Sequence, residues 1–188
     1  LPFFRLFEIA KPLGYRLGCK FHTKKSPQLA DGAKWRRSLY DTLLGSPEDI
    51  AERLRRFEDP AVGLLSHFGT AADNSVPAGN IRNRPWLDRF LPALGQASKI
   101  GNYDWKFPAG SMFWFRFDAL NTLGELGISE DDFEAEAGQF DGTLAHALER
   151  LFPLIAERNG FRFDHSFGVE AAGGSPGARI PVGDQWLD

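Results

Sequence analysis

Several residues that can bind phosphate follow directly after a predicted apolar strand near the start of the 188-residue chain. This group, which we call the basic loop, consists of His22, Thr23, Lys24, Lys25 and Ser26. Arg36 is one of several further cations a short distance later. Open α/β sheets bind ligands at the carboxyl ends of strands, and cations there neutralise phosphate oxygens. The basic loop therefore predicts a diphosphate site, and an ordinary solvated surface is the alternative.

A second polar group lies where the most regularly patterned helix begins, with leucine and isoleucine recurring on one face over residues 144–155. Its members are Glu134, Glu136, Gln139 and Asp141 at the helix entrance, with His146 on the less apolar side of the helix. The dipole and free N–H groups of a helix N-terminus stabilise a carboxylate, so Asp141 suits a general base. Aspartate there equally suits an N-cap. His146, Glu149 and Arg150 have the spacing typical of surface ion pairs.

A third candidate lies in residues 107–114, where Ala-Gly-Ser precedes a strongly apolar strand. Gly110 has no Cβ and can adopt a positive φ, so the backbone can approach a ligand closely. Gly110 and Ser111 are therefore candidate binding residues, and a plain turn into a core strand is the alternative.

The elements that would position these groups follow an α/β pattern. The predictions rest on periodicity, proline breaks and a Ser46-Pro47 helix start. They give helices over residues 3–10, 34–44 and 46–58 and strands over residues 15–22 and 62–65. The middle of the chain is predicted as a loop over 69–84, a helix within 85–94, a strand within 106–116 and a short helix capped by Asp118. The last elements are the helix from residue 144, which Pro153 could kink, and a strand over 161–163.

Composition restricts the function classes. With 43% hydrophobic and 13% aromatic residues, the chain can bury one core, which we assign to a domain over residues 1–167, followed by a Gly/Pro-rich tail over 168–188. The net charge of −3 gives no field that recruits nucleic acid. Cys19, the one cysteine, lies in an apolar strand where a thiol is usually inert. The apolar runs are too short to cross a bilayer, no signal peptide is visible, and the missing initiator Met suggests a piece of a longer protein.

Five peptides taken together resemble the rhamnan synthesis protein F family, bacterial polysaccharide-building proteins regarded as glycosyltransferases. They are HTKKSP at 22–27, WRR at 35–37, LLGSP at 43–47, FPAGSMFW at 107–114 and EAGQFDGTLAHALER at 136–150. Each alone is a weak signal, and their order makes the resemblance specific over roughly residues 1–165.

The resemblance implies a GT-A-like α/β fold, a sheet flanked by helices in which a nucleotide-binding half precedes an acceptor-binding half, with this chain as the later part. By analogy, the basic loop stands where many relatives carry an Asp-x-Asp metal pair, which is absent here. His22, Lys24 and Lys25 would then replace a metal at the donor diphosphate, while Mg or Mn stays an open alternative. Asp141, with Glu136 as the alternative, would be the base.

The implied function is transfer of a sugar, with rhamnose as one candidate, from a nucleoside-diphosphate donor to a glycan hydroxyl in cell-surface polysaccharide or lipopolysaccharide biosynthesis. The basic loop and Arg36 would bind the donor. The acceptor residues would be Gly110, Ser111, Trp114, Gln139 and His146. Trp114 and Trp35 could stack on sugar rings or pack in the core. We expect a cytoplasmic protein, with a lipid-linked acceptor as a route to peripheral attachment at the inner membrane face. The alternatives are a non-catalytic carbohydrate-binding or assembly domain and, less favoured by the net charge, a nucleic-acid module using residues 20–37.

Overall fold

The computed structural model describes residues 2–23, 32–67, 70–74, 82–135, 137–139 and 141–167. Its α-helices are α1 (Pro2–Ala10), α2 (Gly32–Leu43), α3 (Pro47–Arg56), α5 (Arg84–Phe90) and α6 (Leu144–Arg158). The 3₁₀ segments are η1 (Lys11–Leu13), η3 (Ala97–Lys99), η4 (Phe117–Leu126) and η5 (Glu130–Asp132). The strands are β1 (Leu17–Lys20), β2 (Val62–His67), β3 (Ala71–Asp73), β4 (Lys106–Pro108), β5 (Phe113–Arg116) and β6 (Arg162–Phe167). In these ranges no helix is both long and apolar enough to cross a bilayer.

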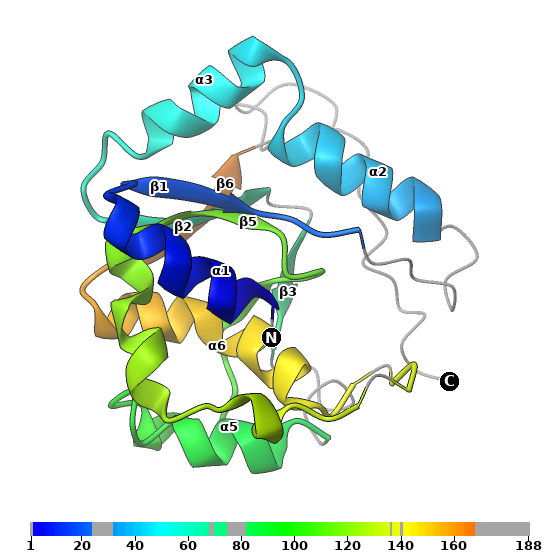
Figure 1. Ribbon diagram of the computed structural model, residues 1–188, viewed down its shortest axis with the longest axis vertical. Coiled ribbons are helices and arrows are strands. Elements are labelled where there is room, and N and C mark those ends of the chain that lie inside the picture. The colour runs from blue at the N-terminus through cyan, green and yellow to red at the C-terminus, as the bar shows by residue number, and fades with distance from the viewer. Residues whose placement is uncertain are drawn as a thin grey trace.

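Four strands form the central sheet in the order β1-β5-β2-β6. Strand β5 runs antiparallel to both neighbours, whereas β2 and β6 are parallel. Strands β3 and β4 form a separate antiparallel pair. Helices α2 and α3 lie on one side of the sheet and α1 and α6 on the other (Figure 1). The predicted α/β class, a sheet flanked by helices, is confirmed, and the sheet is mixed.

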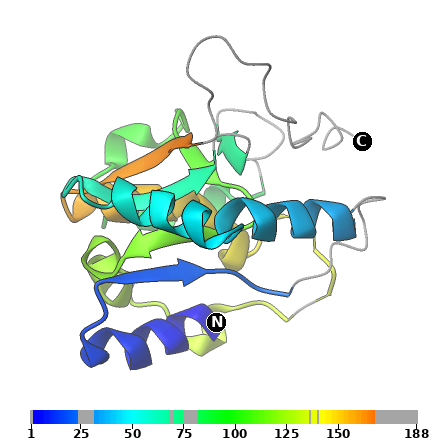
Figure 2. The same ribbon diagram turned by 90° about the horizontal axis from the view of Figure 1, so that it is seen from above.

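Strand β5 divides the core because successive residues of a strand face opposite sides of the sheet. Phe113 and Phe115 pack in the cluster that contains Leu151 of α6. Trp114 packs against the other cluster, which contains Leu43 of α2. Figure 2 shows α2 and α3 in front of the sheet on this second face, running roughly along the direction of β1. The face towards α6 and the face towards α2 are therefore separate environments for any site residue.

The predicted helix start at Ser46 and Pro47 is confirmed. Ser46 Oγ accepts from the Asp49 N–H at 3.2 Å, and Asp49 Oδ2 accepts from the Ser46 N–H at 3.0 Å. This reciprocal pair satisfies two N–H groups that the helix itself cannot. Helix α6 runs without interruption through Pro153, where a kink was an option.

Three local predictions are wrong. Residues Ala71–Asp73 form β3 inside the predicted loop over 69–84, because β4 supplies a partner more than thirty positions later. Asp118 lies inside the first turn of η4 and does not cap it. The strand predicted over 15–22 is shorter, as given above. The predicted tail over 168–188 lies outside the described residues.

Candidate active site

The turn between β4 and β5 has a constrained backbone. Gly110 and Ser111 both have positive φ angles, 79° and 55°. Glycine adopts this region freely, whereas serine pays roughly 1 kcal/mol or more. The Ser111 N–H closes the turn on the carbonyl of Pro108 at 3.0 Å. A strained residue of this kind persists only where surrounding contacts hold it.

Three side chains from outside the turn make such contacts. Lys20 Nζ donates to the carbonyl and to the hydroxyl of Ser111, the latter at 2.7 Å. His22 Nε2 lies 2.9 Å from the carbonyl oxygen of Gly110, and because a carbonyl only accepts, we assign the proton to this nitrogen. The Gly110 N–H donates to Glu149 Oε1 at 2.8 Å. The turn thus joins the end of β1 to α6.

The structure describes only the start of the basic loop. Tyr40 of α2 donates to the carbonyl of His22 at 2.6 Å, which ties the end of β1 to that helix. Thr23 is exposed, and Arg36 is half-buried on α2. The remaining members lie outside the described residues: Lys24, Lys25 and Ser26. Of the expected donor site, His22 is therefore the residue that the structure connects to the Gly110 turn.

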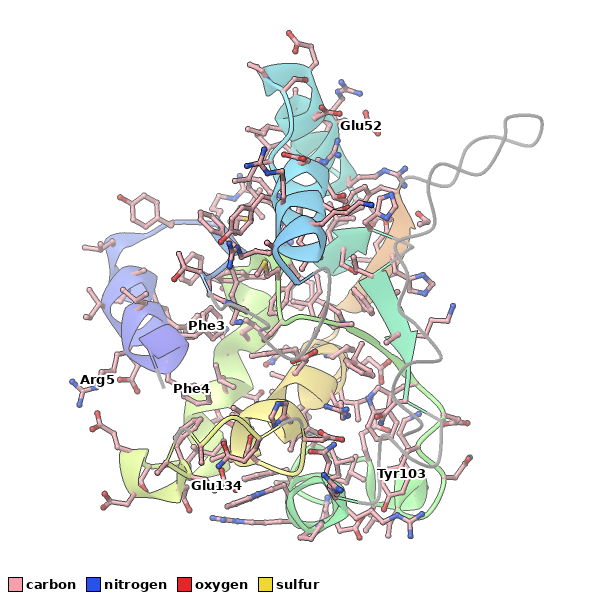
Figure 3. The ribbon with its side chains drawn as sticks, turned by 90° about the vertical axis from the view of Figure 1, so that its right-hand side faces the viewer. Phe3, Phe4, Arg5, Glu52, Tyr103 and Glu134 are labelled. Atoms are coloured by element: carbon pink, nitrogen blue, oxygen red, sulfur yellow. The ribbon has the colours of Figure 1, made fainter. Side chains whose placement is uncertain are left out.

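The entrance to α6 is capped by Thr143, whose Oγ1 accepts from the His146 N–H at 3.4 Å and lies 2.7 Å from His146 Nδ1. Glu134, labelled beside this entrance in Figure 3, accepts from the Leu144 N–H at 2.9 Å. Asp141 precedes the cap by two residues. The alternative that Asp141 is the N-cap is therefore wrong.

Asp141 is held by two donors. Asn83 Nδ2 donates to Asp141 Oδ1 at 2.6 Å, and Asn83 Oδ1 accepts from the Gly142 N–H at 3.1 Å. Arg150 Nη2 lies 3.4 Å from the same carboxylate. Asn83 is fully buried, and sequence analysis missed it because it is 58 positions from Asp141. Its one local signal is its place immediately before the Arg-Pro start of α5.

Two adjacent residues of α6 connect the halves of this arrangement. Glu149 binds the Gly110 N–H, as above, and Arg150 reaches Asp141 while also donating to the carbonyl of His146 at 2.9 Å. The side chains of Arg150 and Asp141 are only 11% and 15% exposed. The prediction of a surface ion pair is therefore wrong for Arg150, because its partner is the largely enclosed Asp141.

Other expected site residues lie apart from this group. Gln139 hydrogen-bonds the backbone two and four residues before it, closing its own loop. The indole N–H of Trp114 donates to the carbonyl of Leu43 at 2.9 Å, on the sheet face opposite α6. Glu136 and the side chain of Trp35 lie outside what the structure describes.

Two groups on β1 have displaced pKa values. Burial raises the pKa of the Cys19 thiol to about 12, which agrees with an inert thiol. Burial lowers the pKa of Lys20 to about 8, against an opposing effect of the Glu149 carboxylate. Within the described ranges, no group of three or more His, Cys, Asp or Glu side chains is placed to hold a metal ion.

Comparison with known proteins gives a family match over nearly the whole described chain. The model of the family described as Rhamnan synthesis protein F matches residues 2–161. The "Uncharacterized protein WxcX" of Xanthomonas campestris pv. campestris strain B100 is 35% identical over 165 residues. The protein of the same description in strain ATCC 33913 is 34% identical over the same length. Each alignment covers 86% of this chain and 23% of the relative, and no solved structure matches.

Proposed function

Because the chain belongs to the rhamnan synthesis protein F family, we propose that it is the acceptor-side part of a glycosyltransferase that builds bacterial cell-surface polysaccharide. One observation carries the proposal beyond the family. The Gly110–Ser111 turn links His22, at the end of β1, to α6, whose Arg150 holds Asp141. A histidine after β1 and an acid before α6 are thereby parts of one connected framework.

We further propose the GT-A type for the fold. The central sheet places the end of β1 and the turn before β5 next to each other, because these strands pair with Lys20 opposite Phe113. That arrangement fits a site at a strand end, where open α/β sheets bind ligands. The chain spans 23% of the length of its curated relatives, so the nucleotide-binding strands would belong to other parts of the longer protein.

The proposed reaction needs two kinds of group. An acceptor hydroxyl oxygen attacks the anomeric carbon of the donor sugar, its proton moves to a carboxylate, and the bond from that carbon to the diphosphate breaks. Asp141 is the proposed base, with Glu136 as the alternative, because a general base must be held within reach of the proton it takes. Asn83 and Arg150 fix its orientation, and a carboxylate retains further acceptor sites for a hydroxyl.

The departing diphosphate needs compensating charge. His22 is the proposed contact that the structure describes, and Lys24 and Lys25 follow it in sequence. Rhamnose, a nucleoside-diphosphate donor, a growing glycan acceptor and a lipid link to the inner membrane face remain parts of the proposal. Transfer that continues in excess chelator is expected if lysines serve in place of a metal, and strict dependence on Mn²⁺ or Mg²⁺ would contradict this part.

The test is sugar transfer by the protein that contains this chain, with thymidine, uridine and guanosine diphospho-sugars as donors. Asp141→Asn should lower turnover by about 10²-fold or more while donor affinity, measured by calorimetry, stays unchanged. Asp118→Asn, an exposed acid on η4, is the matched control and should retain full turnover. Unchanged turnover in Asp141→Asn removes it from the mechanism. Sugar binding without any transfer would instead support a non-catalytic binding domain.

A further inference from the structure

Lys20 has an unusual environment for a lysine. Besides its two hydrogen bonds to Ser111, its ammonium lies 5.2, 5.7 and 5.9 Å from the ring centroids of Phe3, Phe113 and Phe152. These rings come from α1, β5 and α6, and Figure 3 shows Phe3 directed from α1 towards the interior. The strand register explains the placement, because Lys20 pairs with Phe113 and both face α6.

Burying an ammonium among aromatic rings opposes its charged form, and the lowered pKa given above follows from that burial. A residue that only filled this space would be better apolar, since desolvating a charge is unfavourable unless it is bound. Here the charge is bound to Ser111, the one non-glycine residue with positive φ among those described. The buried ammonium is therefore bound directly to the residue with the strained backbone.

The Gly110–Ser111 turn also contacts other residues of the candidate site. The same turn is bound on its other sides by His22 and Glu149, so it connects the residue that follows β1 by two positions to α6. His22, which follows β1, and Glu149 of α6 are titratable groups that contact the turn, and the Glu149 carboxylate also opposes the lowering of the Lys20 pKa. If Lys20 releases Ser111, the turn can relax to a negative φ and both contacts to Gly110 move.

We propose that Lys20 is a positioning residue, whose ammonium holds the Gly110–Ser111 turn in its left-handed conformation and thereby fixes the relative position of His22 and α6. The consequence for sugar transfer rests on the proposed function, whereas the effect on the turn does not. Lys20 touches neither donor nor acceptor in this account and acts through the turn.

The first measurement is an NMR pH titration of the Gly110 and Ser111 amides in the intact chain. Both signals should shift with a common midpoint near pH 8, the pKa of Lys20, and Lys20→Met should abolish that transition. Because His22 also contacts Gly110 and histidines titrate near neutral pH, the transition must persist in His22→Gln. If the signals do not move near pH 8, or move equally in Lys20→Met, the proposal is overturned.

The second measurement is transfer activity. Lys20→Met keeps the length and the apolar stem, and should lower kcat about tenfold. Lys20→Arg, which keeps a donor, should recover part of the loss. Ser111→Gly is the matched control, because glycine adopts positive φ without strain; combined with Lys20→Met it should reduce the loss.

Full activity in Lys20→Met contradicts the proposal. If Lys20→Met does not fold, the wild-type and His22→Gln titrations decide. Absence of transfer in wild type counts against the proposed function, and the titration still tests the turn.

Discussion

At the scale of single residues, the candidate site is held by polar contacts that cross large sequence distances. Asp141 depends on Asn83, and the Gly110 turn depends on Lys20, His22 and Glu149. Asn83 is fully buried and the contacts of the Gly110 turn are partly buried, so loss of a partner leaves a donor or acceptor that water satisfies only in part. The stability of the site is therefore measurable through these partners one at a time.

Asn83→Ala should lower the free energy of unfolding by about 1–3 kcal/mol, because both its amide atoms are bonded and the residue is fully buried. Asn102→Ala is the control: Asn102 is exposed and bonds Asp104 two positions away, so its effect should stay within about 0.5 kcal/mol. Urea unfolding measures both. Equal effects would show that the Asn83 contacts add nothing.

Lys20 predicts a pH dependence of stability. Its pKa is about 8 in the folded chain against an ordinary 10.5. Between these values the unfolded chain retains a proton that the folded chain has lost, so stability rises with pH across this window, and the penalty is complete below pH 8. The unfolding free energy of wild type minus that of Lys20→Met should rise by about 3 kcal/mol from below pH 8 to above pH 10.5. A flat difference would contradict the burial of this ammonium.

At the scale of elements, sequence signals correctly predicted the features that depend on residues close together in the chain. The Ser46-Pro47 start of α3 and the stripe of α6 follow from capping and from 3.6-residue periodicity. Strand β3 escaped prediction because its partner lies far along the chain. The same holds for the site. His22, Gly110 and Asp141 stood out by residue type, whereas Lys20 and Asn83 required the tertiary structure.

The two serine capping boxes allow a test of helix starts. Ser46→Ala should lower the free energy of unfolding by about 1 kcal/mol, because Ser46 caps a ten-residue helix that packs on the sheet. Ser129 makes the same reciprocal contacts at the exposed three-residue η5, so Ser129→Ala should have a smaller effect. Thermal or urea unfolding compares the two variants. The reverse order would contradict the assignment of α3 as a structural support of the sheet.

At the scale of the whole molecule, one mixed sheet separates two core clusters, and the candidate site belongs to the side of α6. Family membership is shown by the match over residues 2–161. The resemblance found in the peptides from HTKKSP to EAGQFDGTLAHALER is thereby confirmed. The transferase activity, the GT-A type and the individual site residues remain predictions.

The whole-molecule charge of −3 predicts that oligonucleotides do not bind, despite the cations over residues 20–37. Fluorescence anisotropy with single- and double-stranded DNA and RNA, at low and moderate salt, checks this. Saturable binding that weakens steeply with salt would revive the nucleic-acid alternative.

The most direct test of the account asks whether one sugar nucleotide changes the surroundings of both the Gly110–Ser111 turn and the entrance to α6. In an NMR titration of the protein that contains this chain with nucleoside diphospho-sugars, we follow the amides of Thr23, Gly110 and Ser111 on one side and of Gly142 and Thr143 on the other. The account predicts that both sets shift with the same apparent Kd for one donor. Shifts confined to one set, or none with any donor, would contradict a shared site.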